Sequence, residues 1–268
     1  MFRALLALPA LFGLACATTR VDIPAEPTAP ADLAVISWNM DAGRGDLSRL
    51  ASDLASGQLT GAPPIDYVFL LQESVSGTDG DASQLAQSRG FHAFVVPVYE
   101  FNGRLRGNAI VSSRPLRETR GIALPRERQP RMAAFGAITV GNQSLYVVST
   151  HFENRLSWLR GGVFSDSARG RQAEALLRAL PDGPGILGGD LNTLLGPAEP
   201  AWRLFAMRFP DTPKDQANAT FRERLVLDHL FFDLPDGWTA SRRVVEDRYG
   251  SDHHPVLGIV AITSRRAG

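Results

Sequence analysis

Short apolar runs of strand length follow one another along most of this 268-residue chain. We predict strands over residues 33–38, 67–71, 91–96, 109–112, 133–140, 144–150, 185–188, 227–232 and 255–262. The run Tyr67 to Leu71 is apolar throughout, which is typical of a strand buried on both faces. Between residues 91 and 150 the runs lack the β-α alternation of a doubly wound parallel fold. The pattern favours an α/β fold with two packed, mixed or largely antiparallel β-sheets and helices outside them.

Two helices are predicted beside these strands, over residues 47–56 and 168–180. The second places Ala173, Leu176 and Leu180 on one face, and a proline follows it. The dipeptide Gly141-Asn142 between two predicted strands is typical of a hairpin turn. No internal repeat or boundary interrupts this part of the chain, which predicts a single domain over residues 33–263.

The apolar runs end in carboxylates, amides and imidazoles. These residues are Asn39, Asp41, Glu73, His151, Asp190, Asn192, Asp228, Asp252 and His253. Any one of them has an ordinary explanation, since an aspartate after a strand is usually a turn former. Polar groups beside a core are costly unless they bind a metal or do chemistry, so several strand ends with the same residue types favour one composite site.

The residue types at these strand ends suit metal-assisted hydrolysis of a phosphate ester. Oxygen-rich ligands without thiolates select a hard cation, Mg²⁺ or Mn²⁺. A carboxylate and an imidazole can then activate water and manage the charge of the leaving group. A serine or cysteine nucleophile is unsupported, because the chain has no Gly-x-Ser-x-Gly motif and its one cysteine, Cys16, lies near the N-terminus.

An ordered set of motifs resembles the endonuclease/exonuclease/phosphatase superfamily. The motifs are Trp38-Asn39-Met40-Asp41, Gln72-Glu73, Gly107-Asn108-Ala109-Ile110, Thr150-His151, Gly189-Asp190-Leu191-Asn192, Leu227-Asp228-His229 and Ser251-Asp252-His253. The resemblance spans roughly residues 33 to 262. It implies a four-layer α/β sandwich, in agreement with the two sheets expected from the strand pattern.

The resemblance also implies a role for each matching residue. Glu73 would be the principal metal ligand, with Asn39 assisting and with Asp41 and Asp252 close to the ion. Asp190 would orient or deprotonate the attacking water, Asn192 would hold the water or the phosphate, and His253 would be a general acid or base. Asp228 would fix the tautomer of His253, His151 would donate to a phosphate oxygen, and Asn108 would line the pocket. The division of proton transfers between Asp190 and His253 stays open.

The stretch from Arg104 to Arg131 carries eight arginines and two glutamates. It is either a surface that steers an anionic substrate or a solvated face of an arginine-rich protein. Arg131 stands just before a predicted strand that runs toward the site, so we expect it to contact phosphate directly or through a neighbour. His92 and His254 fall outside the motifs and are expected to face solvent.

Residues 1–16 are typical of a bacterial lipoprotein signal peptide. Arg3 precedes an apolar run, Ala4 to Ala15, that is too short to span a bilayer. The run ends at Cys16, where a lipobox places its lipid-modified cysteine; cleavage by the ordinary secretory peptidase is the alternative. Residues 17–32 are rich in Thr, Ala and Pro and predict a flexible tether. We therefore expect an exported protein of the cell envelope, anchored to a membrane through Cys16.

The substrate stays open at this point. The formal net charge is zero, which argues against a protein that coats long nucleic acid. A nucleic acid, a phospholipid head group and a small phosphate ester are all compatible with an envelope enzyme, so the protein is either a nuclease or a phosphatase. A catalytically silent binding lipoprotein is a further alternative, although it would be expected to lose Glu73, Asp190 or His253. We expect a monomer.

Overall fold

A computed structural model describes residues 32–154, 166–214 and 218–262. The predicted signal peptide, and the predicted tether apart from Asp32, lie outside these residues. No helix among the described residues is both long enough and apolar enough to cross a membrane.

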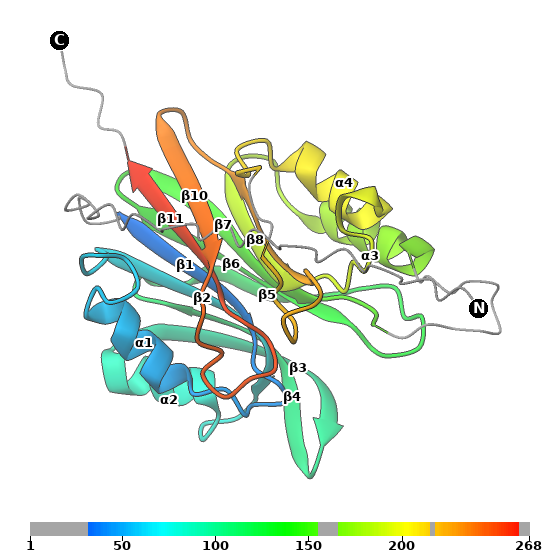
Figure 1. Cartoon of the computed structure of the whole chain (residues 1–268), viewed down its shortest axis with the longest axis horizontal. Helices are drawn as coiled ribbons and strands as arrows, with labels where there is room; N and C mark the ends of the chain where they lie inside the picture. Colours follow the sequence, from blue (N-terminus) through cyan, green and yellow to red (C-terminus); the bar gives the residue numbers. More distant parts are fainter. Residues whose placement is uncertain (1–31, 155–165, 215–217, 263–268) are drawn as a thin grey trace, which may run out of the picture.

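Two mixed β-sheets form the centre of the described chain (Figure 1). The first has the strand order β10-β11-β1-β2-β4-β3, and the second has the order β5-β6-β7-β8-β9. The first comprises β1 (Leu33–Asn39), β2 (Asp66–Val75), β3 (His92–Phe101), β4 (Arg104–Ser112), β10 (Trp238–Val244) and β11 (Val256–Ile262). The second comprises β5 (Arg117–Ala123), β6 (Met132–Val140), β7 (Gln143–His151), β8 (Gly185–Asp190) and β9 (Asp228–Asp233). Each contains one parallel pair, β1 with β2 and β7 with β8.

The helices cover the outer faces of the two sheets. Helices α1 (Leu47–Ala55) and α2 (Asp81–Arg89) pack on the first sheet, while α3 (Asp166–Ala179) and α4 (Pro200–Arg208) pack on the second, after the short 3-10 helix η2 (Gly196–Ala198). Two of these helices follow from the parallel strand pairs. Parallel neighbours need a crossover connection, and α1 connects β1 to β2 while α3 connects β7 to β8. The predicted four-layer sandwich, with two mixed sheets flanked by helices, is confirmed.

Strand β1 is apolar on both faces because both faces are buried. Ile36 and Trp38 belong to the core between the first sheet and α1, whereas Leu33 and Val35 belong to the core between the two sheets. Successive side chains of a strand point to opposite faces, and here both faces are covered. A third core lies between the second sheet and the helices α3 and α4.

The predicted strands and helices are all present, and the turn at Gly141-Asn142 joins β6 to β7. The sequence analysis missed β5, β10, α2 and α4. Strands β5 and β10 are edge strands, and along β5 only Ile122 is buried. A strand that is covered on one face and paired on one side needs few apolar residues, so it lacks the run that identifies the central strands.

Candidate active site

The candidate site lies at the carboxyl ends of the two parallel strand pairs. Asn39, the last residue of β1, is paired with Gln72 near the end of β2, and His151 is paired with Asp190 at the ends of β7 and β8. Asp190 is also paired with Asp228, the first residue of the antiparallel strand β9. The two sheets meet here, because Nδ2 of Asn39 donates to Oδ2 of Asp190 over 2.9 Å. Strand register therefore places side chains that are distant in sequence side by side.

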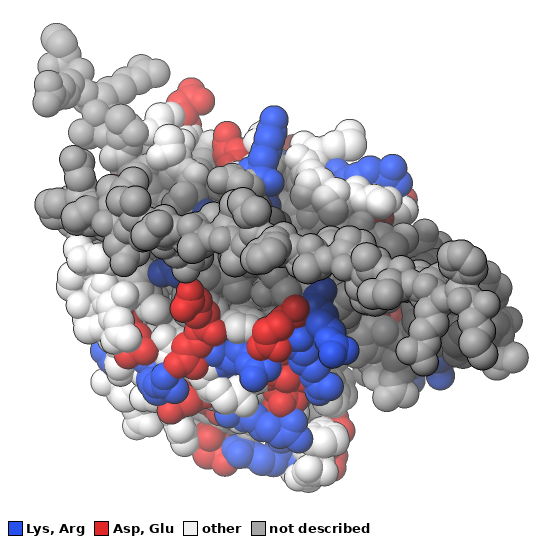
Figure 2. All heavy atoms as spheres, viewed as in Figure 1, with Lys and Arg blue, Asp and Glu red and all other residues white. Residues whose placement is uncertain are grey.

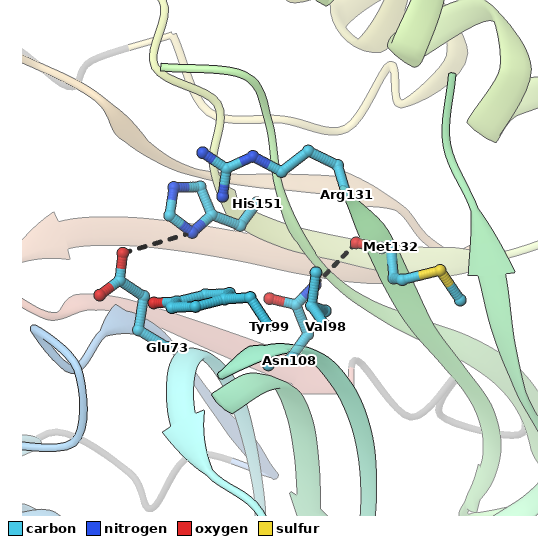
Figure 3. A pocket seen from close by; sticks show the side chains of 8 residues that line it. Glu73, Val98, Tyr99, Asn108, Arg131, Met132 and His151 are labelled. Carbon is cyan, nitrogen blue, oxygen red and sulfur yellow. Dashed lines mark hydrogen bonds and ion pairs between the residues drawn. The ribbon is translucent and has the colours of Figure 1, made fainter. Parts of the chain in front are cut away.

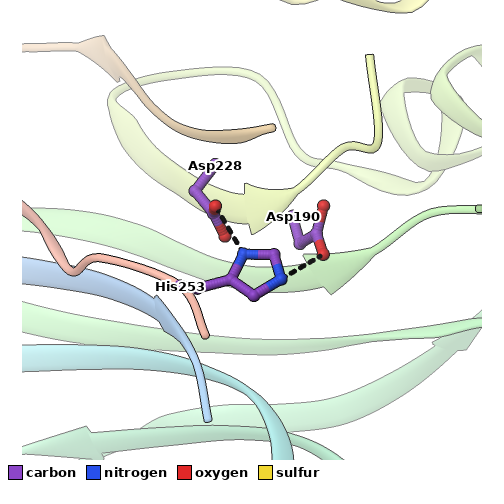
Figure 4. A group of neighbouring side chains, drawn as sticks. All are labelled: Asp190, Asp228 and His253. Atoms are coloured by element: carbon purple, nitrogen blue, oxygen red, sulfur yellow. Dashed lines mark hydrogen bonds and ion pairs between the residues drawn. The ribbon is translucent and has the colours of Figure 1, made fainter. Parts of the chain in front are cut away.

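His253 lies between two buried carboxylates (Figure 4). Its Nδ1 is 2.7 Å from Oδ2 of Asp228, and its Nε2 is 3.9 Å from Oδ2 of Asp190. Burial disfavours the charged imidazole, but the charge of Asp228, its hydrogen bond, and the nearby Asp190 and Asp252 raise the pKa of His253 to about 10. Burial, followed by the charge of Asp228, raises the pKa of Asp190. The bond to Asp228 leaves Nε2 as the nitrogen that faces Asp190.

The segment that carries His253 is tied to the end of β1. Trp38 donates its indole proton to the carbonyl of His253 over 3.1 Å. The hydroxyl of Ser251 donates to the carbonyl of Asn39 over 2.7 Å and accepts the amide of His253 over 3.0 Å. The ring of Phe221 packs on the imidazole with its centroid 4.7 Å away. Hydrogen bonds to its backbone and the contact with the Phe221 ring thus hold His253 in place.

Glu73 is presented by an irregularity in β2. The pairing of β2 with β4 shifts register between Leu71 and Ser74, and Glu73 has a φ of 56°. A glutamate in this left-handed region is strained, and such strain persists only where the surroundings hold it in place. The amide of Ala42 donates to Oε2 of Glu73 over 2.9 Å, while Oε1 lies 3.8 Å from Nδ1 of His151 (Figure 3).

The predicted ligands beside Glu73 offer carboxylate and amide oxygens, which fit a hard divalent cation. Oδ1 of Asn39 accepts the amide of Asp41 over 3.1 Å, and Arg44 pairs with Asp41 over 2.7 Å. The hydrogen bond and charge of Asp41, together with the charges of Asp252 and Glu73, raise the pKa of Arg44. Asp252 joins the site through its Oδ1, which lies 3.8 Å from Nε2 of His253. Carboxylate and amide oxygens without a thiolate are the donors that Mg²⁺ and Mn²⁺ prefer.

Among the described residues, one group has metal-ligand geometry, and it contains residues already described. Asp190, Asp228 and His253 each offer a ligand atom within 4.8 Å of the others. The 2.7 Å contact from Asp228 to Nδ1 of His253 is that of an orienting carboxylate, which favours proton transfer over metal binding at this pair. His151 connects the two groups, because its Nε2 lies 3.5 Å from Asp190.

A pocket opens beside Glu73 and His151 (Figure 3). It is lined by Glu73, Val98, Tyr99, Gly107, Asn108, Arg131, Met132 and His151. Asn108 donates to the carbonyl of Met132 over 2.7 Å, which fixes its amide in the wall. Burial, followed by the charges of Arg131 and His253, lowers the pKa of His151 well below its usual value. Burial also lowers the pKa of Arg131, which is only 5% exposed.

Asn192 lies near Asp190 with its side chain engaged by the backbone. Its backbone nitrogen donates to Oδ1 of Asp190 over 3.0 Å, and its side-chain Nδ2 donates to the carbonyl of Phe152 over 3.2 Å. With a φ of 52°, Asn192 has a left-handed backbone conformation two residues after the end of β8. The structure therefore places it as a support for Asp190, and its Nδ2 is directed at the backbone.

Several arginines of the arginine-rich stretch contact neighbouring side chains. Arg104 pairs with Asp79 over 2.7 Å, Arg114 pairs with Asp66 over 2.7 Å, and Arg120 lies 3.7 Å from the centroid of a phenylalanine ring. Basic and acidic side chains are interspersed on the face shown in Figure 2. These contacts favour a solvated, paired surface over a steering patch.

The two histidines outside the motifs, His92 and His254, differ in exposure to solvent. His92 is exposed, as predicted. The prediction for His254 was wrong: it is 9% exposed, and its Nδ1 lies 2.9 Å from the carbonyl of Val245. This bond satisfies the imidazole beside the start of β11, where adjacent strands bury it.

Three contributions to the site escaped the sequence analysis. Tyr99 lines the pocket beside Glu73, where burial and then the charge of Glu73 raise its pKa. Gln72 donates to the hydroxyl of Ser149 over 3.0 Å and so bridges the sheets beneath the site. Arg106 supports the segment that holds Glu73, through a 2.7 Å bond from its Nε to the carbonyl of residue 42. Each contact depends on strand register, which no local motif encodes.

The family model described as "Endonuclease/Exonuclease/phosphatase family" matches residues 36–253. The chain belongs to this family. The match spans every strand end described above, from β1 to the segment that carries His253. The resemblance inferred from the motifs is therefore confirmed.

Solved structures of other members of the fold are similar to this chain at low sequence identity. The human Nocturnin catalytic domain with a bound sulfate anion has a TM-score of 0.61 and 19% identity, over 86% of this chain and 94% of that one. Sphingomyelinase C from Streptomyces griseocarneus has a TM-score of 0.59 and 20% identity, over 87% and 100%. A beta toxin mutant from Staphylococcus aureus with bound magnesium ions has a TM-score of 0.57 and 18% identity, over 85% and 99%. No curated protein matches the chain by sequence.

Proposed function

We propose that this protein hydrolyses a phosphate ester with a bound divalent cation, Mg²⁺ or Mn²⁺. One observation carries the proposal: Oδ2 of Asp190 lies within 4 Å of Asn39, His151 and His253, which come from the end of β1, the end of β7 and the segment before β11. A buried carboxylate that faces two imidazoles is positioned to orient a water molecule and accept its proton. Membership of a family of nucleases and phosphatases supports the same reaction.

The cation would be held by Glu73 with Asn39, and Asp41 and Asp252 would lie close to it. When bound, it supplies positive charge to the phosphate oxygens. The magnesium ions in the beta toxin support the choice of ion.

The remaining side chains act on the phosphate and the transferred proton. Asp190 orients the attacking water, and His253 contacts the scissile phosphate through Nε2 while Asp228 fixes its orientation. His151 and Arg131 would donate to phosphate oxygens, which is supported by their position in one pocket with Asn108. Hydrogen-bond donors that are held toward the charge developing in the transition state typically make the largest contribution to catalysis of this kind.

Hydrolysis of bis(p-nitrophenyl) phosphate by the purified protein tests the reaction. We expect activity with Mg²⁺ or Mn²⁺ and none after EDTA treatment. Asp190→Ala or His253→Ala should lower kcat by about three orders of magnitude or more. His92→Ala, at an exposed position on β3, is the control and should keep full activity. Variants of Asp190 and His253 that retain most of the activity would contradict these roles.

We further propose that the protein is exported and held at a membrane by a lipid on Cys16, and that it acts as a monomer. The apolar run that ends at Cys16 supports the anchor. Cys16→Ser should move the protein from the membrane fraction to the soluble fraction of the producing cells, and an unchanged distribution contradicts the anchor. Plasmid DNA, RNA, sphingomyelin and inositol phosphates, assayed in parallel, separate nuclease from phosphatase activity.

A further inference from the structure

Arg131 reaches the catalytic pocket from the loop that joins β5 to β6. This loop spans residues 124–131 and is closed by the amide of Leu124, which donates to the carbonyl of Arg131 over 3.0 Å. The buried guanidinium of Arg131 lies in the pocket wall beside His151 (Figure 3). The loop has no helix or strand of its own, so contacts with neighbouring elements must hold Arg131 in place.

A buried carboxylate holds the second half of this loop. Glu153 lies two residues after the end of β7 and is 1% exposed. Its Oε2 accepts the amides of Arg128 and Gln129 over 3.0 Å each. The side chain of Gln129 in turn accepts a 2.8 Å hydrogen bond from Nη2 of Arg131. A short chain of hydrogen bonds therefore connects Glu153 with the guanidinium.

Helix α3 holds both Glu153 and the start of the loop. Oε1 of the buried Gln172 accepts the amide of Glu153 over 2.9 Å, and its Nε2 donates to the carbonyl of Pro125 over 3.0 Å. Between these points, Arg171 pairs with Glu127 over 2.6 Å. The loop is thus bonded to its surroundings at its start, its middle and its second half.

The charge of Glu153 also acts on Arg131. Burial lowers the pKa of Arg131, and the charge of Glu153 opposes this shift more strongly than the charges of Asp190 and Glu73. A buried guanidinium needs such a partner to keep its charge. Glu153 and Arg131 are therefore coupled electrostatically as well as through the loop.

We propose that Glu153 is a positioning residue for Arg131, because it docks the 124–131 loop and so directs the guanidinium at the phosphate. Glu153 is not among the residues that line the catalytic pocket, so it acts through Arg131. The inference rests on the proposed function and adds to it a residue outside the pocket. A displacement of about 1 Å in a group that binds substrate can cost a large factor in rate.

Substitutions of Glu153 test the role of the docking contact with bis(p-nitrophenyl) phosphate as substrate. Glu153→Ala removes the acceptor of both amides and should lower kcat/KM by about tenfold or more. Glu153→Gln keeps an oxygen that can accept the same amides, so it should recover most of the loss. Glu174→Gln, at an exposed position on α3, is the control. Equal losses in the alanine and glutamine variants would show that docking of the loop is not the cause, and would overturn the proposal.

A double-mutant cycle tests whether Glu153 acts through Arg131. In an Arg131→Leu background, Glu153→Ala should lower kcat/KM by less than about a further threefold, because its effect depends on the arginine. Urea unfolding shows which variants are folded. Gln172→Met, which removes the bonds to Glu153 and Pro125, takes the place of Glu153→Ala if that variant does not fold. Additive losses in a folded double variant would show that Glu153 supports the site in general, and would overturn the positioning role.

Binding of inorganic phosphate separates this inference from the proposed reaction. In titration calorimetry, Glu153→Ala and Arg131→Leu should weaken phosphate binding by similar factors, about tenfold or more, while Glu174→Gln should bind like the parent. This pattern in a protein that hydrolyses no ester would reject the proposed reaction and keep the positioning role. Parent-like phosphate affinity in Glu153→Ala, with weakened affinity in Arg131→Leu, would reject the positioning role alone.

Discussion

Asp228 accepts a 2.7 Å hydrogen bond from Nδ1 of His253 at the rim where the two sheets meet, and both side chains are buried. The contact fixes which ring nitrogen faces Asp190. A neutral asparagine at position 228 could no longer stabilise the charged imidazole or enforce this tautomer.

We therefore expect Asp228→Asn to lower kcat by roughly 10²- to 10⁴-fold with little change in KM, because the geometry of phosphate binding is kept. Steady-state kinetics with bis(p-nitrophenyl) phosphate measures the effect. Asp236→Asn, in an exposed turn before β10, should behave like the parent. A fall of less than about fivefold in kcat would show that the orientation of His253 does not depend on this carboxylate.

Arg106 is expected to act as a positioning residue for Glu73. Its Nε donates to the carbonyl of Ala42 over 2.7 Å, and the amide of Ala42 donates to Glu73 over 2.9 Å. Ala42 has a φ of 55°, a conformation that costs an alanine about 1–3 kcal/mol unless neighbouring groups hold it. Arg106 is 8% exposed and also donates to the carbonyl of Phe101. Loss of this support should release Glu73 from its strained conformation.

Arg106→Met should weaken Mg²⁺ binding by about tenfold or more, since each 1.4 kcal/mol of lost support is a factor of ten. Titration calorimetry with Mg²⁺ measures this directly, and Arg106→Lys should recover part of the affinity. Arg104→Met, at a half-exposed neighbouring position, is the matched control. Unchanged Mg²⁺ affinity in a folded Arg106→Met protein would rule out the positioning role.

His229 should make the protein sensitive to acid. It is 3% exposed, and its Nε2 lies 3.0 Å from the hydroxyl of Thr193. Burial, with the charge of Arg242, lowers its pKa to about 3. The unfolded chain takes up a proton near pH 6.5 while the folded chain does not, so the free energy of unfolding falls as the pH drops from 6.5 toward 3.

From pH 7.5 to 4.5 this histidine should contribute a loss of about 2–3 kcal/mol. Urea unfolding of the parent and of His229→Gln at the two pH values isolates the contribution from that of other groups. His229→Gln should lose less stability on acidification by about this amount. Parallel pH dependences in the two proteins would contradict the assignment.

Gly188 permits the close approach of the two sheets. A Cβ at this position would lie 2.8 Å from Cδ1 of Leu70 and 2.9 Å from Oγ of Ser37, both on the first sheet. Gly188→Ala should lower the free energy of unfolding by about 1–3 kcal/mol through overpacking. At Gly136 the nearest atom is the end of the Leu116 side chain at 3.3 Å, so Gly136→Ala is the milder control. Denaturant unfolding compares the two variants, and equal stabilities would contradict the tight contact.

The central strands could be predicted because their signal is local. The run Tyr67 to Leu71 is apolar on both faces, and the sandwich covers both faces. Edge strands such as β5 carry few apolar residues, so the same signal is absent there. The bulge between Pro97 and Tyr99 depends on the pairing of β3 with β4, and one sequence does not encode it locally.

The sequence by itself determined the residue types at the strand ends, the family and the layered fold, since hydrophobic periodicity and short motifs are properties of neighbouring residues. Tertiary structure decided which of these residues become neighbours. The pairing of Asp190 with both His151 and Asp228, the support of Glu73 by Arg106, and the burial of His254 all follow from strand register and sheet packing. Register and packing bring together residues that are tens of positions apart, and only the folded chain fixes those distances.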